Sequence, residues 1–149
     1  MVTCASFRSC GVLRLKLRAW MANTDKNMKN QSFAQRLSYA ASGIRTAFRT
    51  EASFRTQLLL AVMAGVVLAL VRPPLVWVAL CIVSGAAVLA AELVNTALEH
   101  LADRLHPEQH PAIRAAKDCA AAAVLVASMA AVLIGILTLA VSLHLLNRA

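Results

Sequence analysis

The residues best suited to chemistry lie near the end of a long apolar stretch, in the segment from Ala91 to Glu99. An ionisable group near the centre of a bilayer costs roughly 2.5–3.5 kcal/mol on insertion scales, so a chain that keeps such groups is expected to use them. At about 3.6 residues per turn, five polar residues here follow the spacing i, i+3, i+4, i+7 and i+11. They are expected to share one helix face: Glu92, Asn95, Thr96, Glu99 and Asp103.

The two glutamates of this face are expected on opposite sides of the membrane boundary. A helix that enters the hydrocarbon near Leu75 reaches the far interface around Asn95, after about 20 residues at 1.5 Å each. Glu92 then lies just inside the membrane and Glu99 just outside it, about 10 Å apart along the axis. The inner carboxylate suits a general base acting on a lipid alcohol, whereas Asn95 and Glu99 offer hard oxygen atoms for Mg²⁺.

Further charged residues flank the same boundary. Glu51 precedes the first apolar span and could supply another oxygen ligand to that metal. Lys117 and Asp118 precede the third span, and a cation there would neutralise charge that develops during phosphoryl transfer. For Asp103, an ordinary helix-end charge paired with Arg104, Arg114 or Lys117 is an equally good interpretation.

The composition indicates one small integral membrane unit that must position these groups. Of the 149 residues, 60% are hydrophobic and 15% are charged, which is too apolar for a soluble domain. Transmembrane helices are expected at about 54–71, 75–98 and 119–146, and the Arg72-Pro73-Pro74 stretch should end the first of them.

The N-terminal part is expected to lie on the membrane surface. Between residues 32 and 50, apolar residues recur at helical spacing among arginines, which predicts an amphipathic surface helix. Residues 1–31 form a basic extension of uncertain status, with Met21 and Met28 as plausible alternative starts. The expected fold is therefore an all-α membrane domain over 32–149.

The distribution of basic residues predicts the topology. Ten of the 15 Lys and Arg residues lie at or before Arg55 and three lie between Arg104 and Lys117, so the N-terminus and a 100–118 loop should be cytosolic. These charges border apolar spans without interleaved aromatic residues, which argues against nucleic-acid binding. The four cysteines show no metal-type or disulfide spacing.

Several motifs resemble the bacterial integral-membrane diacylglycerol kinase family, which also includes undecaprenol kinases. They are Glu51-Ala52-Ser53-Phe54-Arg55, the Glu92 to Glu99 segment with Asp103, and Ala116-Lys117-Asp118. The resemblance runs from about Phe33 to His144. It implies a homotrimer of three-transmembrane subunits in the bacterial inner membrane, each with an N-terminal surface helix, and active sites built between subunits.

The resemblance also implies residue roles. Glu92 would be the base on the lipid hydroxyl with Asn95 supporting catalysis, and Glu51 and Glu99 would hold Mg²⁺. The expected ATP-binding set is Tyr39, Glu51, Glu99, Glu108, Gln109, His110, Lys117 and Asp118. The expected lipid-binding set is Arg45, Phe54, Arg55 and Glu92.

The expected activity is an ATP- and Mg²⁺-dependent kinase that converts diacylglycerol to phosphatidic acid at the cytosolic face. Undecaprenol is the alternative substrate, because Gln57 stands where diacylglycerol-specific members commonly have a glutamate. The pairs Glu99-His100 and His110-Pro111 also resemble the undecaprenol kinase branch more closely. An alternative of another class is a non-catalytic oligomeric membrane protein whose polar residues hydrogen-bond helices together.

Overall fold

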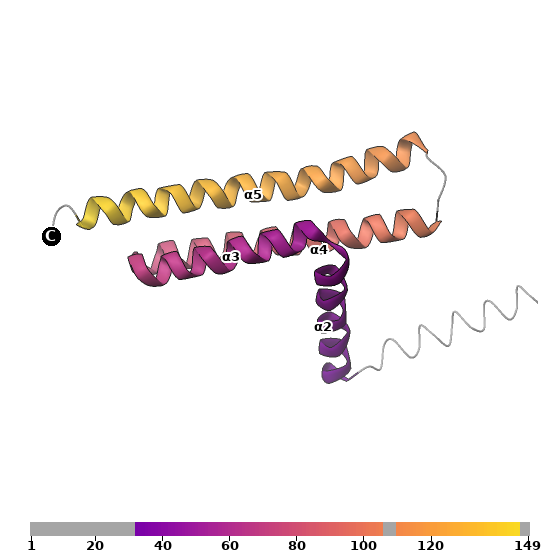
Figure 1. Cartoon of the computed structure of the whole chain (residues 1–149), viewed down its shortest axis with the longest axis horizontal. Helices are drawn as coiled ribbons and strands as arrows, with labels where there is room; N and C mark the ends of the chain where they lie inside the picture. The colour runs from indigo at the N-terminus through magenta and orange to yellow at the C-terminus, as the bar shows by residue number, and fades with distance from the viewer. Residues whose placement is uncertain (1–31, 106–109, 147–149) are drawn as a thin grey trace, which may run out of the picture. The chain divides into compact units, whose positions relative to one another are not determined.

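The computed structural model describes residues 32–105 and 110–146, and the regular structure within these ranges is helical (Figure 1). The helices are α2 (Phe33–Thr50), α3 (Ala52–Val71), α4 (Leu75–Leu105) and α5 (Pro111–Leu146). The last three are long and apolar enough to cross a membrane, which confirms the predicted fold class. The chain divides into two units after Ser42, and α3, α4 and α5 lie in the second.

A reciprocal capping box begins α2. The Ser32 N–H donates to Gln35 Oε1 at 3.0 Å, and the Gln35 N–H donates to Ser32 Oγ at 3.4 Å. This exchange pairs two backbone donors that the first turn of a helix leaves without a partner. At the other end, Glu51 has extended backbone angles (φ −105°, ψ 118°) and separates α2 from α3.

The predicted stop after the first span is confirmed. Arg72 adopts a left-handed conformation (φ 51°), and its N–H donates to the Leu68 carbonyl at 2.9 Å. Pro73 and Pro74 follow, and a proline ring cannot continue the helical hydrogen-bond ladder. The Pro74 carbonyl then accepts the N–H of Trp77 at 2.9 Å, in the first turn of α4.

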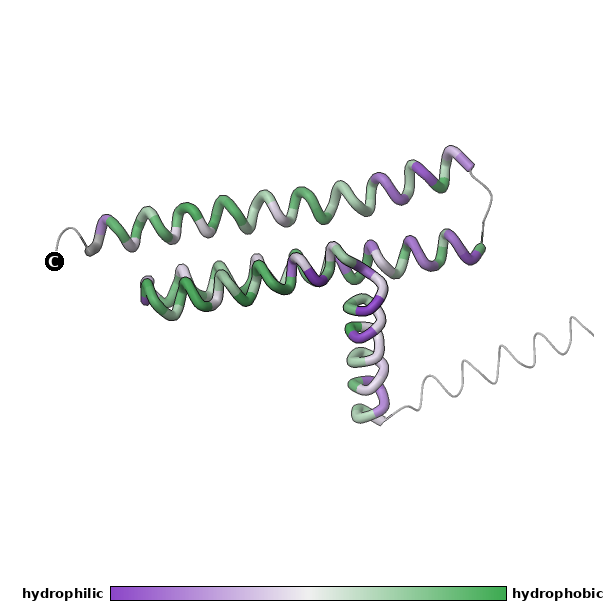
Figure 2. Tube along the Cα trace, viewed as in Figure 1, coloured by the Kyte–Doolittle hydropathy of each residue, from purple (hydrophilic) through white to green (hydrophobic). Residues whose placement is uncertain are grey.

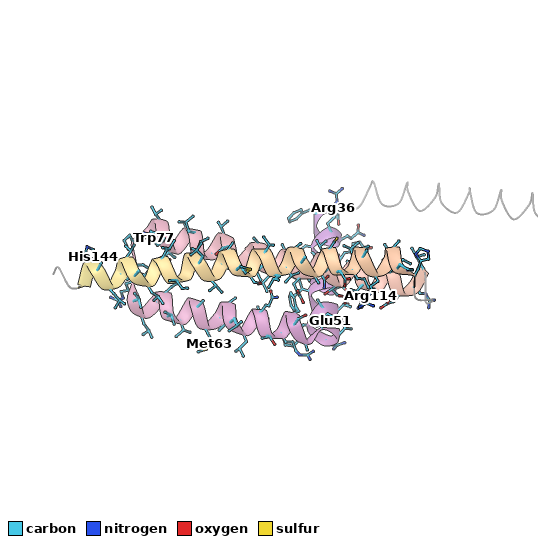
Figure 3. The ribbon with its side chains drawn as sticks, turned by 90° about the horizontal axis from the view of Figure 1, so that it is seen from above. Arg36, Glu51, Met63, Trp77, Arg114 and His144 are labelled. Carbon is cyan, nitrogen blue, oxygen red and sulfur yellow. The ribbon has the colours of Figure 1, made fainter. Side chains whose placement is uncertain are left out.

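The three long helices run antiparallel in chain order. Figure 3 places Glu51 and Arg114 at one end of this bundle and Trp77 and His144 at the other. The α4–α5 interface is the most extensive, and α3 packs against both helices. Within the interface, Cys81 Sγ lies 3.3 Å from Thr138 Oγ1, in contact between α4 and α5.

Most of the apolar surface of these helices is not covered by the chain itself. In the most apolar window of each helix, no more than 11% of the residues are buried. Figure 2 shows the apolar residues along all three helices, with polar residues gathered at the C-terminal part of α4 and the N-terminal part of α5. Such a surface is suited to lipid and to further protein subunits, since water would hydrate it unfavourably.

The expected 100–118 loop is largely helical, which corrects that prediction. α4 continues to Leu105 and α5 begins at Pro111, because backbone hydrogen bonds do not depend on the apolar pattern from which the spans were predicted. His110 precedes α5 and caps it: its Nδ1 accepts the Ala112 N–H at 3.2 Å. Proline at the first helical position loses no hydrogen bond. The extended helices carry charged residues beyond the apolar spans.

Candidate active site

Glu92 is the most enclosed carboxylate of the described residues, with an exposed fraction of 2% in this chain. It lies on α4, and Ser53 in the first turn of α3 donates its Oγ–H to Glu92 Oε1. This hydrogen bond engages Oε1 and not Oε2. A carboxylate oxygen with lone pairs to spare can accept a hydrogen bond from a substrate hydroxyl.

Asn95 and Glu99 form a second polar pair on the same helix. Asn95 Nδ2 donates to Glu99 Oε1 at 3.0 Å, across the i, i+4 spacing that the sequence predicts. Glu92 and Glu99 lie on one polar face of α4, but their carboxylates have different partners. The inner one contacts α3, whereas the outer one is held by an amide of its own helix.

Three buried polar atoms in this region have no hydrogen-bond partner among the described residues: Gln57 Oε1, Asn95 Oδ1 and Thr96 Oγ1. Gln57 lies on α3, one turn after Ser53, and Thr96 lies one turn after Glu92. A buried polar group without a partner costs about 1–3 kcal/mol. These atoms of α3 and α4 are thus suited to a further partner, such as a substrate, ordered water or another subunit.

Glu51 contacts α4 beyond Glu92, toward the C-terminal end of that helix. Its Oε1 lies 3.5 Å from His100 Nε2, and the two side chains are 25% and 48% exposed respectively. His100 follows Glu99 directly along α4. The structure therefore brings the start of α3 to the segment of α4 that carries the predicted metal-binding glutamate.

The donor set is suitable for Mg²⁺. No group of three or more His, Cys, Asp or Glu side chains arranged to hold a metal occurs within residues 32–105 and 110–146. Mg²⁺ sites in phosphoryl-transfer enzymes, however, commonly use only one or two carboxylates and complete the shell with phosphates and water. Glu51 and Glu99 supply carboxylates of this type, and Asn95 Oδ1, which has no hydrogen-bond partner among the described residues, supplies an amide oxygen.

Asp103 and Lys117 form an ion pair between α4 and α5. Lys117 Nζ lies 2.5 Å from Asp103 Oδ1, with the two side chains 32% and 69% exposed respectively. Lys117 is one of the three basic partners that the sequence predicts in the alternative interpretation of Asp103. Asp118, the next residue, is exposed. The nucleotide-binding roles of Lys117 and Asp118 stay predictions.

Among the described residues, no hydrogen bond or ion pair joins Glu92 to Phe54, Tyr39, Arg45 or Arg55. Phe54 is buried, whereas Tyr39 and Arg45 are exposed on α2. The guanidinium of Arg55 donates to the carbonyls of Phe48 and Arg49 at 3.1 and 3.4 Å, at the end of α2.

Of the predicted nucleotide contacts in the α4–α5 connection, His110 caps α5 as described above. Glu108 and Gln109 lie outside the described residues.

Two residues of the site, Ser53 and His100, were not predicted from the sequence to have a functional role. Ser53 was part of a motif, and His100 was a neighbour of Glu99. Each contacts a residue distant in sequence: Ser53 bonds Glu92, 39 residues away, and His100 contacts Glu51 at the start of α3. A spacing pattern within one helix carries no signal for such pairs, because they depend on the register of two antiparallel helices.

Comparison with known proteins matches this architecture to one family. The family model described as "Prokaryotic diacylglycerol kinase" matches residues 38–139. The chain is 31% identical to an undecaprenol kinase of Bacillus subtilis over 118 residues, which cover 78% of this chain and 95% of the relative. It is 34% identical to a diacylglycerol kinase of Escherichia coli over 95 residues, covering 64% and 78%.

A diacylglycerol kinase of a Synechocystis species is 37% identical over 98 residues, which cover 65% of this chain. The match spans little more than half of that relative, 56% of its length. The family match, the bacterial relatives and the three apolar helices indicate a multi-pass bacterial membrane protein. The chain belongs to the prokaryotic diacylglycerol kinase family.

Proposed function

We propose that this chain is an ATP- and Mg²⁺-dependent lipid kinase that phosphorylates the primary hydroxyl of diacylglycerol and releases phosphatidic acid. The observation that carries the proposal is the environment of Glu92, a carboxylate that is 2% exposed and directly follows the uncharged first part of α4, residues 75–91. It accepts one hydrogen bond from Ser53 and lies one turn from the Asn95–Glu99 pair. A base inside the apolar span and oxygen ligands beyond it suit a reaction between a lipid alcohol and a soluble phosphate donor.

In the proposed reaction, the lipid hydroxyl donates its hydrogen bond to Glu92. The carboxylate takes the proton as the hydroxyl oxygen forms a bond to the γ-phosphorus of ATP. The bond between that phosphorus and the β–γ bridging oxygen breaks, and ADP leaves with the electron pair. The Asn95–Glu99 pair keeps an acidic and an amide oxygen at the boundary where the two substrates meet.

Glu51 and Glu99 would hold Mg²⁺, which when bound neutralises charge on the phosphate oxygens. Lys117 and Asp118 would contact ATP from the start of α5, and Lys117 would exchange part of its pairing with Asp103 for the phosphates. The proposed assembly is a homotrimer, whose subunits would cover apolar surface that each chain leaves exposed. The proposed location is the bacterial inner membrane, with the N-terminus and this site on the cytosolic side.

Undecaprenol is a second candidate substrate, and one observation favours it. Gln57, which stands where diacylglycerol-specific members commonly have a glutamate, lies on α3 one turn after Ser53, and its buried Oε1 has no partner among the described residues. The Bacillus subtilis relative, an undecaprenol kinase, also shares the longest matched segment of the three relatives above. Both lipids present a primary hydroxyl, so the same base would serve either one.

The test is a transfer assay with purified protein in mixed micelles that contain γ-labelled ATP, Mg²⁺ and one lipid at a time. Higher kcat/KM with diacylglycerol supports the main proposal, and higher kcat/KM with undecaprenol supports the second candidate. Lack of phosphorylation of both lipids overturns the two proposals and favours a non-catalytic membrane protein. The matched control is the Glu92→Gln protein, which keeps the side-chain shape.

A further inference from the structure

We infer that Ser53 is a positioning residue for Glu92: its hydroxyl holds Oε1 so that Oε2 is aimed at the lipid hydroxyl. This inference rests on the proposed function. The structure supplies the contact itself, since Ser53 Oγ donates to Glu92 Oε1 from the first turn of α3. Because this hydrogen bond engages Oε1, Oε2 is the oxygen that would face the substrate.

A buried glutamate needs such a constraint because its side chain has three rotatable bonds. Without a donor on one oxygen, the carboxylate plane can turn and move the second oxygen away from the reacting proton. A small displacement of a catalytic group lowers the rate steeply, by as much as about a hundredfold for 1 Å. A base oriented by a third group is the general arrangement for activating a hydroxyl nucleophile.

The placement of Ser53 is itself fixed at two points. Glu51, two residues earlier, lies 3.5 Å from His100 on α4. Phe54, the next residue, is 3% exposed in the core. The contact of Glu51 with His100 holds the start of α3 beside α4, and the burial of Phe54 restricts movement of the same turn, so the serine hydroxyl stays at the level of Glu92.

The neighbouring polar residues do not provide this function. Asn95 donates its amide to Glu99 instead, and the unpartnered atoms Gln57 Oε1 and Asn95 Oδ1 are acceptors that cannot donate to a carboxylate. The Thr96 hydroxyl makes no hydrogen bond with the described residues. Within the described part of the chain, the orientation of Glu92 is therefore assigned to Ser53.

The experiment compares Ser53→Ala with Ser53→Thr in the mixed-micelle assay. We expect Ser53→Ala to lower kcat about tenfold or more, with little change in KM for ATP, because a hydrogen bond to a charged acceptor is lost. Threonine keeps the hydroxyl, and Ser53 is exposed enough for an added methyl group, so Ser53→Thr should recover most of kcat. The control is Ser84→Ala, which removes a hydroxyl that donates to the Cys81 carbonyl of its own helix at 3.1 Å.

A second measurement separates this inference from the kinase proposal. The infrared band of the Glu92 carboxyl group, identified by its loss in Glu92→Gln, should shift in Ser53→Ala and keep its position in Ser53→Thr. An inactive wild-type protein overturns the kinase proposal and with it the catalytic use of the contact. An active wild type whose kcat and Glu92 band are both unchanged in Ser53→Ala overturns the positioning role alone, as does a rise in kcat.

Discussion

Replacement of Glu92 by glutamine is the most discriminating perturbation of this protein. The amide has nearly the shape of the carboxylate and its oxygen can still accept the hydrogen bond from Ser53. What disappears is the ability to take a proton from the lipid hydroxyl. The substitution therefore separates a catalytic carboxylate from a polar residue that only connects two helices.

The effects of Glu92→Gln on the free energy of unfolding and on the reaction rate can both be estimated. The hydrogen bond from Ser53 changes from a charged to a neutral acceptor, which weakens it by about 1 kcal/mol. Removal of a charge from a side chain that is 2% exposed acts in the opposite direction, so the free energy of unfolding should change by no more than about 1 kcal/mol. Loss of a general base lowers the rate about 10²- to 10⁴-fold, or about 3–5 kcal/mol in activation free energy.

The assay measures kcat and KM for ATP in mixed micelles, with thermal unfolding and oligomer size measured on the same preparation. The expected result is a fall in kcat of at least a hundredfold with folding and assembly intact. A Glu92→Gln protein that keeps more than a tenth of the wild-type kcat would refute the role of Glu92 as base. Loss of assembly with the loss of activity would instead indicate a structural role.

Other parts of the site lead to distinct expectations. Glu99→Ala should raise the Mg²⁺ concentration for half-maximal rate about tenfold or more, and an unchanged metal titration in an active protein would contradict its role as ligand. Asp103→Asn should leave the midpoint of thermal unfolding nearly unchanged, because its pair with Lys117 is largely exposed; a large fall in that midpoint would contradict this. Thr138→Val, which removes the contact with Cys81, should destabilise the fold by about 0.5–1 kcal/mol and leave kcat unchanged; a tenfold fall in kcat would show that this contact reaches the site.

The polar face of α4 shows how far a spacing argument reaches. The sequence predicts that Glu92, Asn95, Glu99 and Asp103 share one helix face, and the Asn95–Glu99 hydrogen bond confirms the i, i+4 part of it. In the structure, the residues at the two ends of this face contact different helices. Glu92 meets α3 through Ser53, whereas Asp103 meets α5.

The sequence by itself determined the all-α fold and the limits of α2 and α3 to within two residues, but not the end of α4 or the start of α5. Runs of apolar residues long enough to cross a bilayer, and the stop at Pro73 and Pro74, are local properties that need no knowledge of neighbouring helices. The same is true of the face of α4 that carries the carboxylates, because helical periodicity alone places those residues together.

Only the tertiary structure decided which groups meet across helices. The contacts of Ser53 with Glu92 and of Glu51 with His100 depend on how α3 slides along α4, and a shift of one turn would separate them. Packing between whole helices sets that register, and the packing depends on many side chains at once. The identity of the carboxylate is therefore readable from the sequence, whereas the hydroxyl that holds it is readable only from the fold.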